Sequence, residues 1–584
     1  MSARFDDLVE GTAFELCDPV CVLRAAQPDE VVDVLRAAEA AAYASRYVAG
    51  FVTYEAAAGL DPCLSVVGWP AGHPLRTLPL AWFGVFASRR SVTPGSAVTE
   101  SDRSASVGGW SLDRTRGWHA AAVADIRAGI ARGDYYQVNL TARVTAAVAD
   151  PSRMYQRMAS AQRGRYNALI RTGAVDVVSC SPELFFERDG IEITTRPMKG
   201  TARRGRWPAE DSTRAVALRT SDKERAENVM IVDLLRNDLG RIAEVGTVRV
   251  PHLFTAERFP TLWQLTSTVC ATLGGDADLA AVFRALFPCG SVTGAPKQAA
   301  MRAIAAHEGR ARGVYCGAVG WLEPTTSGEP PHARFSVAIR TMTCASGHAE
   351  YGTGGGITWS SREDHEWAEL LTKTDILEPP LTPAGLFETM RFTPGVGAVH
   401  LHRHLDRLEA SARYFAIPFE RHEATAALRR AVRERERDGR LRLQLDANGD
   451  VTVRIHDLDL GTEPVRLALC ATAVRSDDRS LFHKQTDRRR YDSARAACPH
   501  ADDVVLHNER GEITETTTAN LAISIDGRWW TPALDCGLLP GVERARLIEA
   551  GVLAERPIKL GELIHAEEIA VINSLRGWRA ARIA

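Results

Sequence analysis

Lysine is scarce in this sequence. Of 584 residues, 71 are lysine or arginine, and only six of those are lysines. A lysine amine can lose its proton and act as a nucleophile, whereas an arginine guanidinium stays protonated in proteins. Where arginine is the usual cation, a lysine is therefore a stronger candidate for covalent chemistry. The six are Lys199, Lys223, Lys297, Lys373, Lys484 and Lys559.

Other features are also missing. The 11 cysteines include no CxxC pair, which predicts neither a disulfide framework nor a zinc site. No apolar segment follows a basic N-terminus and no run of 18 apolar residues occurs, so we expect no secretory signal and no membrane span. The net charge of -2 argues against a basic surface over the whole molecule. We therefore expect a cytoplasmic protein without a nucleic-acid or membrane partner.

The composition is that of a globular protein, with 45% apolar and 25% charged residues. Three prolines at 379, 380 and 383 cannot continue a helix and predict an extended linker over residues 378–384. The linker would separate a first domain, residues 1–377, from a second, residues 385–584. We expect each of them to fold around its own core.

The first domain mixes two kinds of pattern. Strand-like runs include VDVVSCSPELFF, IEITTRP and RFSVAIRTM. Helix-like runs cover 118–132, with apolar residues four apart, 221–239, with Ser221 and Glu224 as a capping box, and 361–375, with Ser360 and Glu363 at its start. This mixture predicts an α+β or α/β class rather than an all-β fold or a helical bundle.

Two pairs of glutamates have helical i,i+3 spacing, which places both carboxylates of a pair on one face. Two such faces brought together would form an oxygen-rich site for a hard cation such as Mg²⁺. Lys373 follows the second pair by one turn and would point to the same place. The same spacing is also common on solvated, salt-bridged helices. The pairs are Glu224 with Glu227 and Glu366 with Glu369.

A hairpin predicted around Asp189-Gly190 could bring Glu183 and Lys199 into one pocket. The alternative is that Lys199 lies on a strand surface. A glycine-rich string at 351–361 could hold an anion with backbone N–H groups, although alone it is a weak signal.

The first domain resembles the chorismate-binding enzyme family, which includes anthranilate, isochorismate and aminodeoxychorismate synthases. The resemblance covers nearly all of residues 115–377 and implies a large α/β sandwich-type domain. It rests on a series of strings in the family's order. They are GDYYQVNLTAR (133–143), SPELFF, RPMKGTARRG, ERAENVMIVDLLRNDLGR, FPCGSVTGAPKQAAM, YCGAVGW, AIRT and GGGITWSS.

The resemblance implies a role for each matching residue. The lysine in the P-[IM]-K-G-T string marks aminodeoxychorismate synthases, whereas anthranilate synthases have alanine there. Lys199 would be the nucleophile and Glu183 the general acid. Glu227 and Glu369 would bind Mg²⁺ directly, and Glu224 and Glu366 would hold metal-bound water. The substrate contacts would be Arg340, Tyr315, Lys373, Thr293, Gly355 and Gly356.

Two departures from the family pattern stand out. Cys289 replaces a glycine, and QRGRYN at 162–167 replaces a proline-containing string that helps to form a tryptophan site in relatives. The resemblance therefore does not imply tryptophan binding here. No G-x-C-x-G amidotransferase elbow occurs, so ammonia would come from solution or from a separate glutaminase subunit.

In the second domain, residue types alone suggest a cofactor site. Lys484 is the only lysine between 374 and 558, and a deprotonatable amine is what pyridoxal phosphate requires for attachment. Glu515 could pair with the pyridinium nitrogen, and Arg407 could bind the phosphate. Equally, Glu515 and Arg407 could be ordinary surface charges.

The order of motifs from GLFETMRF to VINSLRGW, residues 385–583, resembles class IV pyridoxal-phosphate enzymes, and most closely 4-amino-4-deoxychorismate lyases. The resemblance assigns Lys484 to the cofactor aldehyde, Glu515 to the pyridine nitrogen and Thr389 to proton transfer. It also implies a two-lobed α+β domain and a homodimer. The expected phosphate contacts are Arg407, Gly541, Val542 and Ser574.

Together the two resemblances imply a bifunctional enzyme that makes 4-aminobenzoate, a folate precursor, from chorismate with Mg²⁺ and pyridoxal phosphate. The first product would be the substrate of the second domain. Three alternatives remain: an amino-acid aminotransferase as the second domain, anthranilate synthesis in the first, and a non-catalytic scaffold. For the remaining lysines we expect a salt bridge at Lys223, a structural role at Lys297 and an exposed charge at Lys559.

Overall fold

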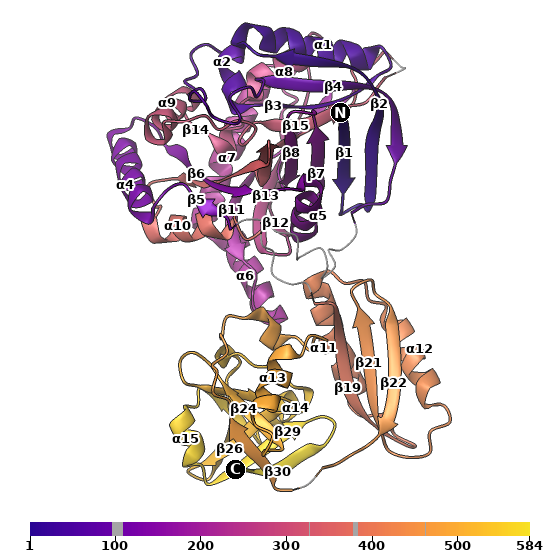
Figure 1. The fold of residues 1–584 in the computed structure, drawn as a ribbon. Coiled ribbons are helices and arrows are strands. Elements are labelled where there is room, and N and C mark those ends of the chain that lie inside the picture. Colours follow the sequence, from indigo (N-terminus) through magenta and orange to yellow (C-terminus); the bar gives the residue numbers. More distant parts are fainter. Residues whose placement is uncertain (96–108, 326–327, 378–382, 462) are drawn as a thin grey trace. The chain divides into compact units, whose positions relative to one another are not determined.

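The computed structural model describes residues 1–95, 109–325, 328–377, 383–461 and 463–584. The chain forms two compact units: Met1–Arg203 with Arg214–Pro380, and Arg204–Thr213 with Leu381–Ala584 (Figure 1). The predicted linker at 378–384 lies mostly outside the described residues. One feature has no sequence signal: Arg204–Thr213 groups with the second unit although it follows a motif of the first.

In the described part of the chain, the first unit is built on one folded sheet of 18 strands. Pairing runs in the order β13-β10-β9-β16-β15-β3-β4-β2-β1-β7-β8-β17-β18-β6. β11 and β12 pair with β13 at one end, and β5 and β14 pair with β6 at the other. The strands are β1 Ser2–Asp7, β2 Thr12–Ala25, β3 Tyr47–Val52, β4 Ala81–Ser91, β5 Ser111–Leu112, β6 Gln137–Ala147, β7 Tyr166–Arg171, β8 Asp176–Ser181, β9 Leu184–Asp189, β10 Glu192–Arg196, β11 Met198–Arg203, β12 Arg249–Arg258, β13 Leu262–Thr272, β14 Gly294–Ala295, β15 Ala318–Leu322, β16 Ala333–Val337, β17 Thr341–Ala345 and β18 His348–Ile357.

The two ends of this strand order meet in space. β11 lies at one end of the order and β18 near the other, yet a Cβ atom built on Gly356 of β18 would lie 2.5 Å from the Nζ atom of Lys199 on β11. A side chain at this position would displace the end of the lysine side chain. The sheet therefore folds back on itself, and the predicted sandwich-type α/β domain is confirmed.

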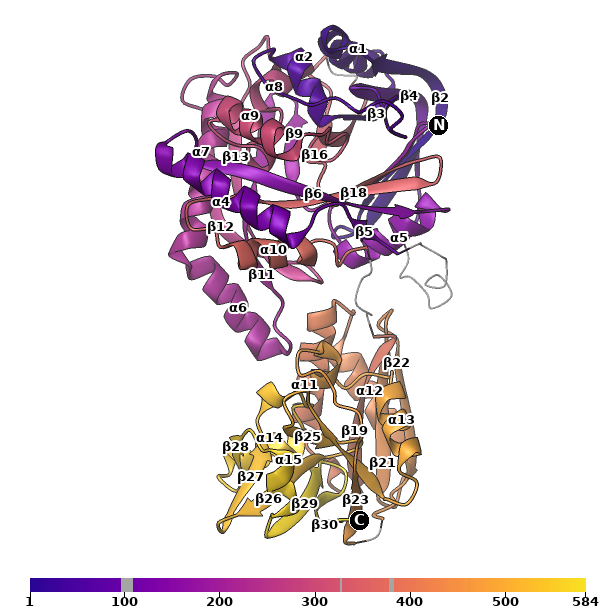
Figure 2. The ribbon, with the colours of Figure 1, turned by 60° about the vertical axis from the view of Figure 1, so that its left-hand side comes forward.

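Helices cover the sheet, and local signals fix several of their ends. α4 begins where the side chain of Thr115 accepts a hydrogen bond from Trp118 and ends at Gly133, whose φ is 83°. α4 and α10 lie against the β6–β18 part of the sheet (Figure 2). The helices are α1 Val31–Tyr43, α2 Ala57–Leu60, α4 Arg116–Arg132, α5 Pro151–Gln162, α6 Pro208–Thr220, α7 Asp222–Gly240, α8 Leu279–Leu286, α9 Lys297–Glu308 and α10 Glu363–Thr372.

Of the predicted helix starts at Ser221 and Ser360, the first is confirmed and the second is not. Ser221 caps α7, since its hydroxyl accepts a hydrogen bond from the backbone N–H of Glu224 at 3.4 Å. The prediction of Ser360 as the start of the next helix was wrong. α10 begins after Arg362, which makes no side-chain cap, and the Ser360 hydroxyl instead lies 3.1 Å from that of Thr358.

The second unit contains two sheets, which confirms the predicted two-lobed α+β architecture. The smaller sheet has the order β20-β19-β21-β22, and the larger one β25-β24-β23-β30-β29-β26-β27-β28, with β25 also paired to β26. The strands are β19 Gly385–Thr393, β20 Gly397–Ala398, β21 Gly439–Asp446, β22 Val451–Asp457, β23 Val465–Leu469, β24 Asp503–His507, β25 Ile513–Thr516, β26 Asn520–Ile525, β27 Arg528–Pro532, β28 Ala554–Arg556, β29 Glu568–Asn573 and β30 Gly577–Ile583.

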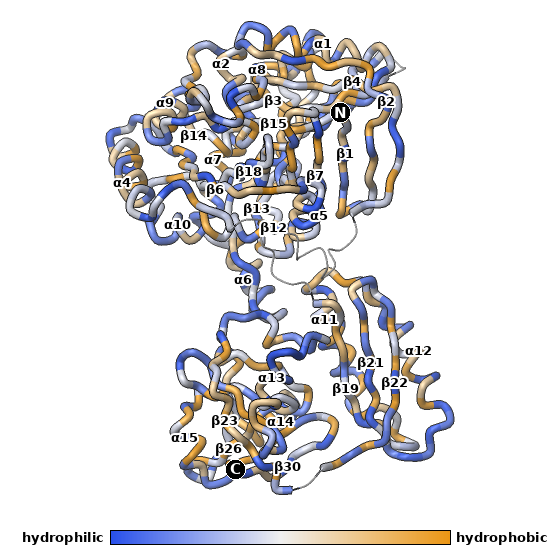
Figure 3. Tube along the Cα trace, viewed as in Figure 1, coloured by the Kyte–Doolittle hydropathy of each residue, from blue (hydrophilic) through white to orange (hydrophobic). Residues whose placement is uncertain are grey.

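Alternating hydropathy along β21 and β22 shows how the smaller sheet is built (Figure 3). Leu441, Leu443 and Leu445 of β21 point into a core shared with α11 and α12, while the residues between them are more exposed. In the described part of the chain, no helix has the length and apolarity needed to cross a membrane. The helices of this unit are α11 Leu401–Phe415, α12 Arg421–Val432, α13 Arg489–Ala497, α14 Val542–Glu549 and α15 Leu560–Ile564.

Candidate active sites

The first site gathers around Lys199. Its Nζ atom lies 3.5 Å from an oxygen of Glu227, on α7, and beside the backbone of Gly356, on β18. The hydroxyl of Thr358 donates to the other oxygen of Glu227 at 3.2 Å. Lys199 is mostly buried, with 15% of its side chain exposed. Lys199 is therefore not on an exposed strand surface, and its charge acts on Glu183, the residue with which it was predicted to share a pocket.

The four predicted metal-site glutamates share this site. Burial and the neighbouring charge of Glu227 raise the pKa of Glu224, and burial and Glu369 raise that of Glu366. Burial acts in the same direction on Glu369, but the ammonium of Lys373, 2.8 Å away, makes the net shift of its pKa downward. Such mutual repulsion indicates a site short of positive charge.

The donor chemistry of these glutamates fits a hard cation, because all of their ligand atoms are carboxylate oxygens. Among the described residues, no three acidic, histidine or cysteine side chains form a ready-made metal group. Each of the two predicted direct ligands has a lysine as an ion-pair partner: Glu227 has Lys199 and Glu369 has Lys373.

Glu183 is buried at the start of β9, with 2% of its surface exposed. Burial raises the pKa of Glu183 to about 7, although hydrogen bonds from Ser291 and from the backbone of Met198 act in the opposite direction. A carboxyl group that keeps its proton near neutral pH is suited to general acid catalysis. Ser291 was not predicted as a site residue, although its place in the GSVTGAPK string was a signal for it.

The predicted substrate contacts divide into two groups. Lys373 donates to the carbonyl of Gly354 at 2.7 Å, and a Cβ atom on Gly355 would lie 3.8 Å from its Nζ atom, so both belong to the Lys199 site. Arg340 donates instead to the side-chain carbonyl of Gln162. Thr293 donates to the carbonyl of Cys289 at 3.0 Å. In the described residues, no hydrogen bond links Arg340, Tyr315 or Thr293 to Lys199.

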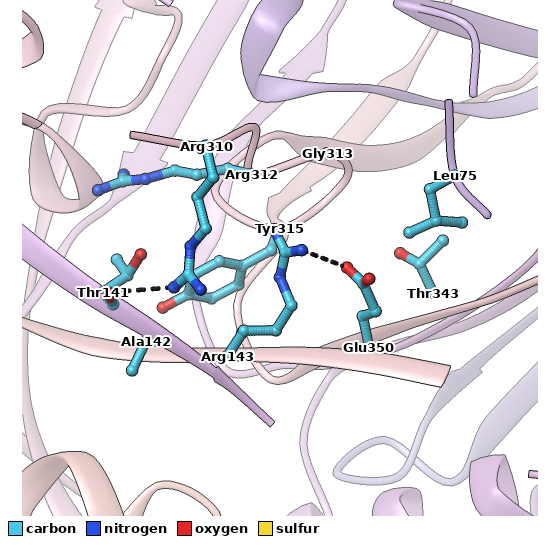
Figure 4. Close-up of a pocket in the computed structure, with 11 residues that line it drawn as sticks. Leu75, Thr141, Ala142, Arg143, Arg310, Arg312, Gly313, Tyr315, Thr343 and Glu350 are labelled. Atoms are coloured by element: carbon cyan, nitrogen blue, oxygen red, sulfur yellow. Dashed lines mark hydrogen bonds and ion pairs between the residues drawn. The ribbon is translucent and has the colours of Figure 1, made fainter. Parts of the chain in front are cut away.

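Tyr315 lines a small polar cavity of about 10 Å³, enough for roughly one water molecule (Figure 4). Arg143, Arg310 and Glu350 face it, and Arg143 pairs with Glu350 at 2.8 Å. The ring of Tyr315 also packs on Gly352 of β18. This cavity is too small for a ring-sized substrate.

Gln137 is a residue of the first site that the sequence analysis did not single out. Its side chain is fully buried, and a Cβ atom on Gly356 would lie 2.9 Å from its Nε2 atom and 2.5 Å from Lys199 Nζ. Both polar atoms of its amide lack a hydrogen-bond partner among the described residues. Such an amide, buried beside the candidate nucleophile, is available to a ligand.

The remaining lysines behave as expected. Lys223 lies 3.9 Å from oxygens of Glu224 and Glu227. Lys297 contacts Asp238 at 3.4 Å and the carbonyl of Leu286, which is a structural role. Lys559, with 56% of its side chain exposed, pairs with Glu512.

The raised pKa of Glu183 predicts a pH-dependent cost to stability. Above pH 7 its charge is buried, while in the unfolded chain it ionises at its ordinary 4.5, so folding stability falls as pH rises from 4.5 through 7. A shift from 4.5 to about 7 corresponds to about 3 kcal/mol. Glu183→Gln should therefore raise the thermal midpoint of the first unit by several degrees at pH 8 and leave it nearly unchanged at pH 4.5. A variant that is less stable at both pH values would contradict the assigned shift.

The second site gathers around Lys484, which the structure places against β19. The backbone N–H of Phe387 donates to the carbonyl of Lys484, and the Nζ atom of Lys484 lies 4.7 Å from the centre of the Phe387 ring. Burial, followed by the charge of Arg407, lowers the pKa of Lys484 to about 8. A neutral amine is therefore accessible near neutral pH, as attachment to an aldehyde requires.

Glu515 on β25 is within electrostatic reach of Lys484. Burial raises the pKa of Glu515 to about 7. The hydroxyl of Tyr491 donates to one oxygen at 2.8 Å and the N–H of Leu539 to the other at 3.2 Å. A buried carboxyl group so fixed can pair with a protonated pyridine nitrogen. The sequence analysis missed Tyr491, which lies seven residues after Lys484 in a charged string.

The predicted phosphate contacts converge. Arg407 donates to the carbonyl of Pro540 at 3.0 Å, directly before Gly541 and Val542 at the start of α14. His404, one turn before Arg407, lies 2.8 Å from the hydroxyl of Ser574. A Cβ atom on Gly541 would lie 1.9 Å from the side-chain oxygen of Asn520, so a larger residue cannot occupy this turn. A helix start with an arginine and a serine is a suitable phosphate site.

Thr389 lies on β19 two residues beyond Phe387, so the two side chains share one face of the strand. Arg442 is paired with Thr389 in the sheet register, and its guanidinium lies 4.0 Å from the centre of the Phe387 ring. The second site thus offers the amine of Lys484, the carboxyl group of Glu515 and the hydroxyl of Thr389. It also offers the predicted phosphate contacts, which we call the phosphate cup: Arg407, Gly541, Val542 and Ser574. These groups fit pyridoxal phosphate.

Comparison with known proteins defines the class of each unit. Residues 10–379 match the model of chorismate-binding enzymes, and the chain belongs to that family. Residues 385–583 match the model of class IV aminotransferases, a group of pyridoxal-phosphate enzymes that includes aminodeoxychorismate lyases. Both family predictions from the sequence are confirmed, and both are families of enzymes.

The first unit is similar to curated aminodeoxychorismate synthases. The chain is 35% identical over 318 residues to aminodeoxychorismate synthase component 1 of Escherichia coli strain K12, covering 54% of this chain and 69% of that protein. It is 40% identical over 267 residues to the Klebsiella aerogenes protein of the same name, covering 46% and 58%. The match thus spans about two thirds of those relatives' lengths or less.

A solved structure supports the fold of the first unit. Anthranilate synthase component I from Streptococcus pneumoniae TIGR4 superposes with a TM-score of 0.53 at 23% identity, covering 64% of this chain and 92% of that chain. At this identity the similarity shows the fold alone.

Proposed function

We propose that the protein converts chorismate to 4-aminobenzoate in two steps, one on each unit. The first unit would aminate chorismate to 4-amino-4-deoxychorismate, and the second would eliminate pyruvate from that product. The observation that carries the proposal is that each candidate site places a largely buried lysine near a carboxylate: Lys199 beside Glu227, and Lys484 near Glu515.

In the first step, the amine of Lys199 would attack C2 of the chorismate ring as the C4 hydroxyl leaves with a proton from Glu183. Ammonia would then bond to C4 as Lys199 departs. The covalent intermediate divides one difficult displacement into two easier ones. The position of Lys199 on β11 and the raised pKa of Glu183 are what this sequence of events needs.

Mg²⁺ would be held by Glu227 and Glu369, with Glu224 and Glu366 contributing through water. Its charge would neutralise the ring carboxylate of the substrate. We expect EDTA to remove the synthase activity and to leave elimination from added aminodeoxychorismate intact. Glu369→Gln should weaken Mn²⁺ binding, measured by electron paramagnetic resonance, by about tenfold or more.

The matched control for that variant is Glu363→Gln, because Glu363 lies on the same helix and is exposed. It should bind Mn²⁺ as the unchanged protein does. Equal Mn²⁺ affinity in the Glu369 variant would contradict the proposed metal site.

In the second unit, pyridoxal phosphate would supply an electron sink. Lys484 would hold the cofactor's aldehyde carbon, Glu515 its ring nitrogen, and Arg407, Ser574, Gly541 and Val542 its phosphate. Lys484 and Thr389 would move the protons that accompany loss of pyruvate. Two further cations face this site: Arg442 over Phe387, and Arg488, whose charge acts on Lys484.

The arginine pair favours elimination from aminodeoxychorismate over transamination of an ordinary amino acid. Aminodeoxychorismate carries two carboxylates. Burial lowers the pKa of Arg442, and the nearby positive charge of Arg488 lowers it further. Two anions would relieve that repulsion. The test is to supply aminodeoxychorismate and, separately, common amino acids with a 2-oxo acid. Pyruvate release from the first alone is expected; amino-group transfer in the second would favour the aminotransferase.

Ammonia would come from a separate glutaminase subunit, and the second unit would form a homodimer. All 11 cysteines are unpaired, which supports a reducing compartment and hence a cytoplasmic location.

A further inference from the structure

Glu388 is a buried carboxylate at the centre of a charged network in the second unit. It lies on β19 with 1% of its surface exposed. Its two oxygens accept hydrogen bonds from Arg407: Oε1 from Nε at 2.8 Å and Oε2 from Nη2 at 2.6 Å. Oε2 also lies 2.7 Å from Nδ1 of His404. One carboxylate thus fixes two side chains of α11.

Each partner of Glu388 continues to a different segment of the chain. Arg407 reaches the carbonyl of Pro540, before α14, at 3.0 Å. His404 reaches the hydroxyl of Ser574, after β29, at 2.8 Å. Three segments that are distant in sequence are therefore connected through one carboxylate, and two members of the network, Arg407 and Ser574, are residues assigned to the cofactor phosphate.

Burying the charged carboxylate of Glu388 costs more free energy than a purely structural contact would require. Removing a carboxylate from water is expensive, and a buried ion pair is often no more stabilising than apolar residues of the same size. Burial would raise the pKa of Glu388, but Arg407 and His404 lower it to about 2, so the group stays charged. Its two hydrogen bonds to Arg407 fix the plane of the guanidinium and leave other N–H groups for a ligand.

We propose that Glu388 is the positioning residue of the phosphate cup: it orients Arg407 directly, and Ser574 through His404, toward a phosphomonoester. This inference rests on the proposed cofactor of the second unit. Glu388 would not touch the cofactor. Its effect would be selective for the phosphate, because among the described residues no hydrogen bond or ion pair joins Glu388 to the amine of Lys484, whose Nζ atom lies 4.7 Å from the centre of the Phe387 ring.

The experiment compares two aldehydes that differ only in the phosphate. The full-length apoprotein is titrated with pyridoxal phosphate and with pyridoxal, and binding is followed by absorbance. Glu388→Gln should raise the dissociation constant for pyridoxal phosphate by about 10–100-fold. The value for pyridoxal should change by about twofold or less. Losing the Glu388 charge removes an influence that raises the pKa of Lys484, so attachment to the aldehyde is not weakened on that account.

Two further variants serve as controls, one for a change of charge at the surface and one for poor folding of Glu388→Gln. Glu420→Gln, an exposed position before α12, should bind both aldehydes like the unchanged protein. Ser574→Ala removes the end of the network without exposing a buried charge and should show the same phosphate-selective loss, by about tenfold, even if Glu388→Gln folds poorly. Inorganic phosphate should compete with pyridoxal phosphate less well in both cup variants.

Unchanged affinity for pyridoxal phosphate in the cup variants, or an equal loss for both aldehydes, would overturn the proposal. Failure of the proposed function would look different: the unchanged protein would then bind neither aldehyde with a visible band.

Discussion

Replacing Lys199 by alanine is expected to reduce aminodeoxychorismate formation by about a thousandfold or more, because Lys199 is the amine that lies beside both Glu227 and Gly356. The elimination of pyruvate from added aminodeoxychorismate should be unchanged. The assay is turnover of chorismate with ammonium and Mg²⁺, followed by chromatography of the products.

Lys199→Arg separates nucleophilicity from charge. An arginine keeps the cation near Glu227 but cannot be deprotonated. If Lys199 forms a bond to the substrate, the arginine variant should be as inactive as the alanine variant. Lys559→Ala, an exposed lysine of the second unit, should retain full synthase activity. Near-normal chorismate amination by Lys199→Arg would show that the residue supplies charge alone.

Replacing Lys484 by alanine should abolish both the visible absorbance band of bound pyridoxal phosphate and the release of pyruvate. The buried amine near Glu515 is the group to which the cofactor's aldehyde would attach, and in the described residues no second lysine lies in that site. Lys484→Arg should fail in the same way. The first step should continue, so aminodeoxychorismate should accumulate when chorismate and ammonium are supplied. A colourless unchanged protein, or a variant that still releases pyruvate, would contradict the role of Lys484.

The sequence predicted the two folds and the two lysines because motif residues in both units lie on regular elements. Lys199 follows a hairpin whose turn, Asp189-Gly190, is where it was expected. Glu224 and Glu227 share a helix whose start at Ser221 was also expected. Such features are local, and the signals for them are local as well.

Contacts between distant segments could not be predicted in the same way. Glu388 meets Arg407 and His404 only after β19 and α11 pack together, and Ser574 joins from a segment 170 residues beyond His404. Nothing in the order of motifs indicates that Arg204–Thr213 packs with the second unit. There the backbone carbonyl of Arg206 lies 3.2 Å from a ring nitrogen of His483, the neighbour of Lys484. Tertiary contacts, not local preference, create these features.

The central claim is that one chain converts chorismate to 4-aminobenzoate. The most direct measurement is to supply the purified protein, loaded with pyridoxal phosphate, with chorismate, Mg²⁺ and ammonium, and to identify and count the products. We predict 4-aminobenzoate and pyruvate in equal amounts, with aminodeoxychorismate in their place when Lys484 is changed to alanine. Anthranilate as the aromatic product, or amination without pyruvate release by the unchanged protein, would contradict the account.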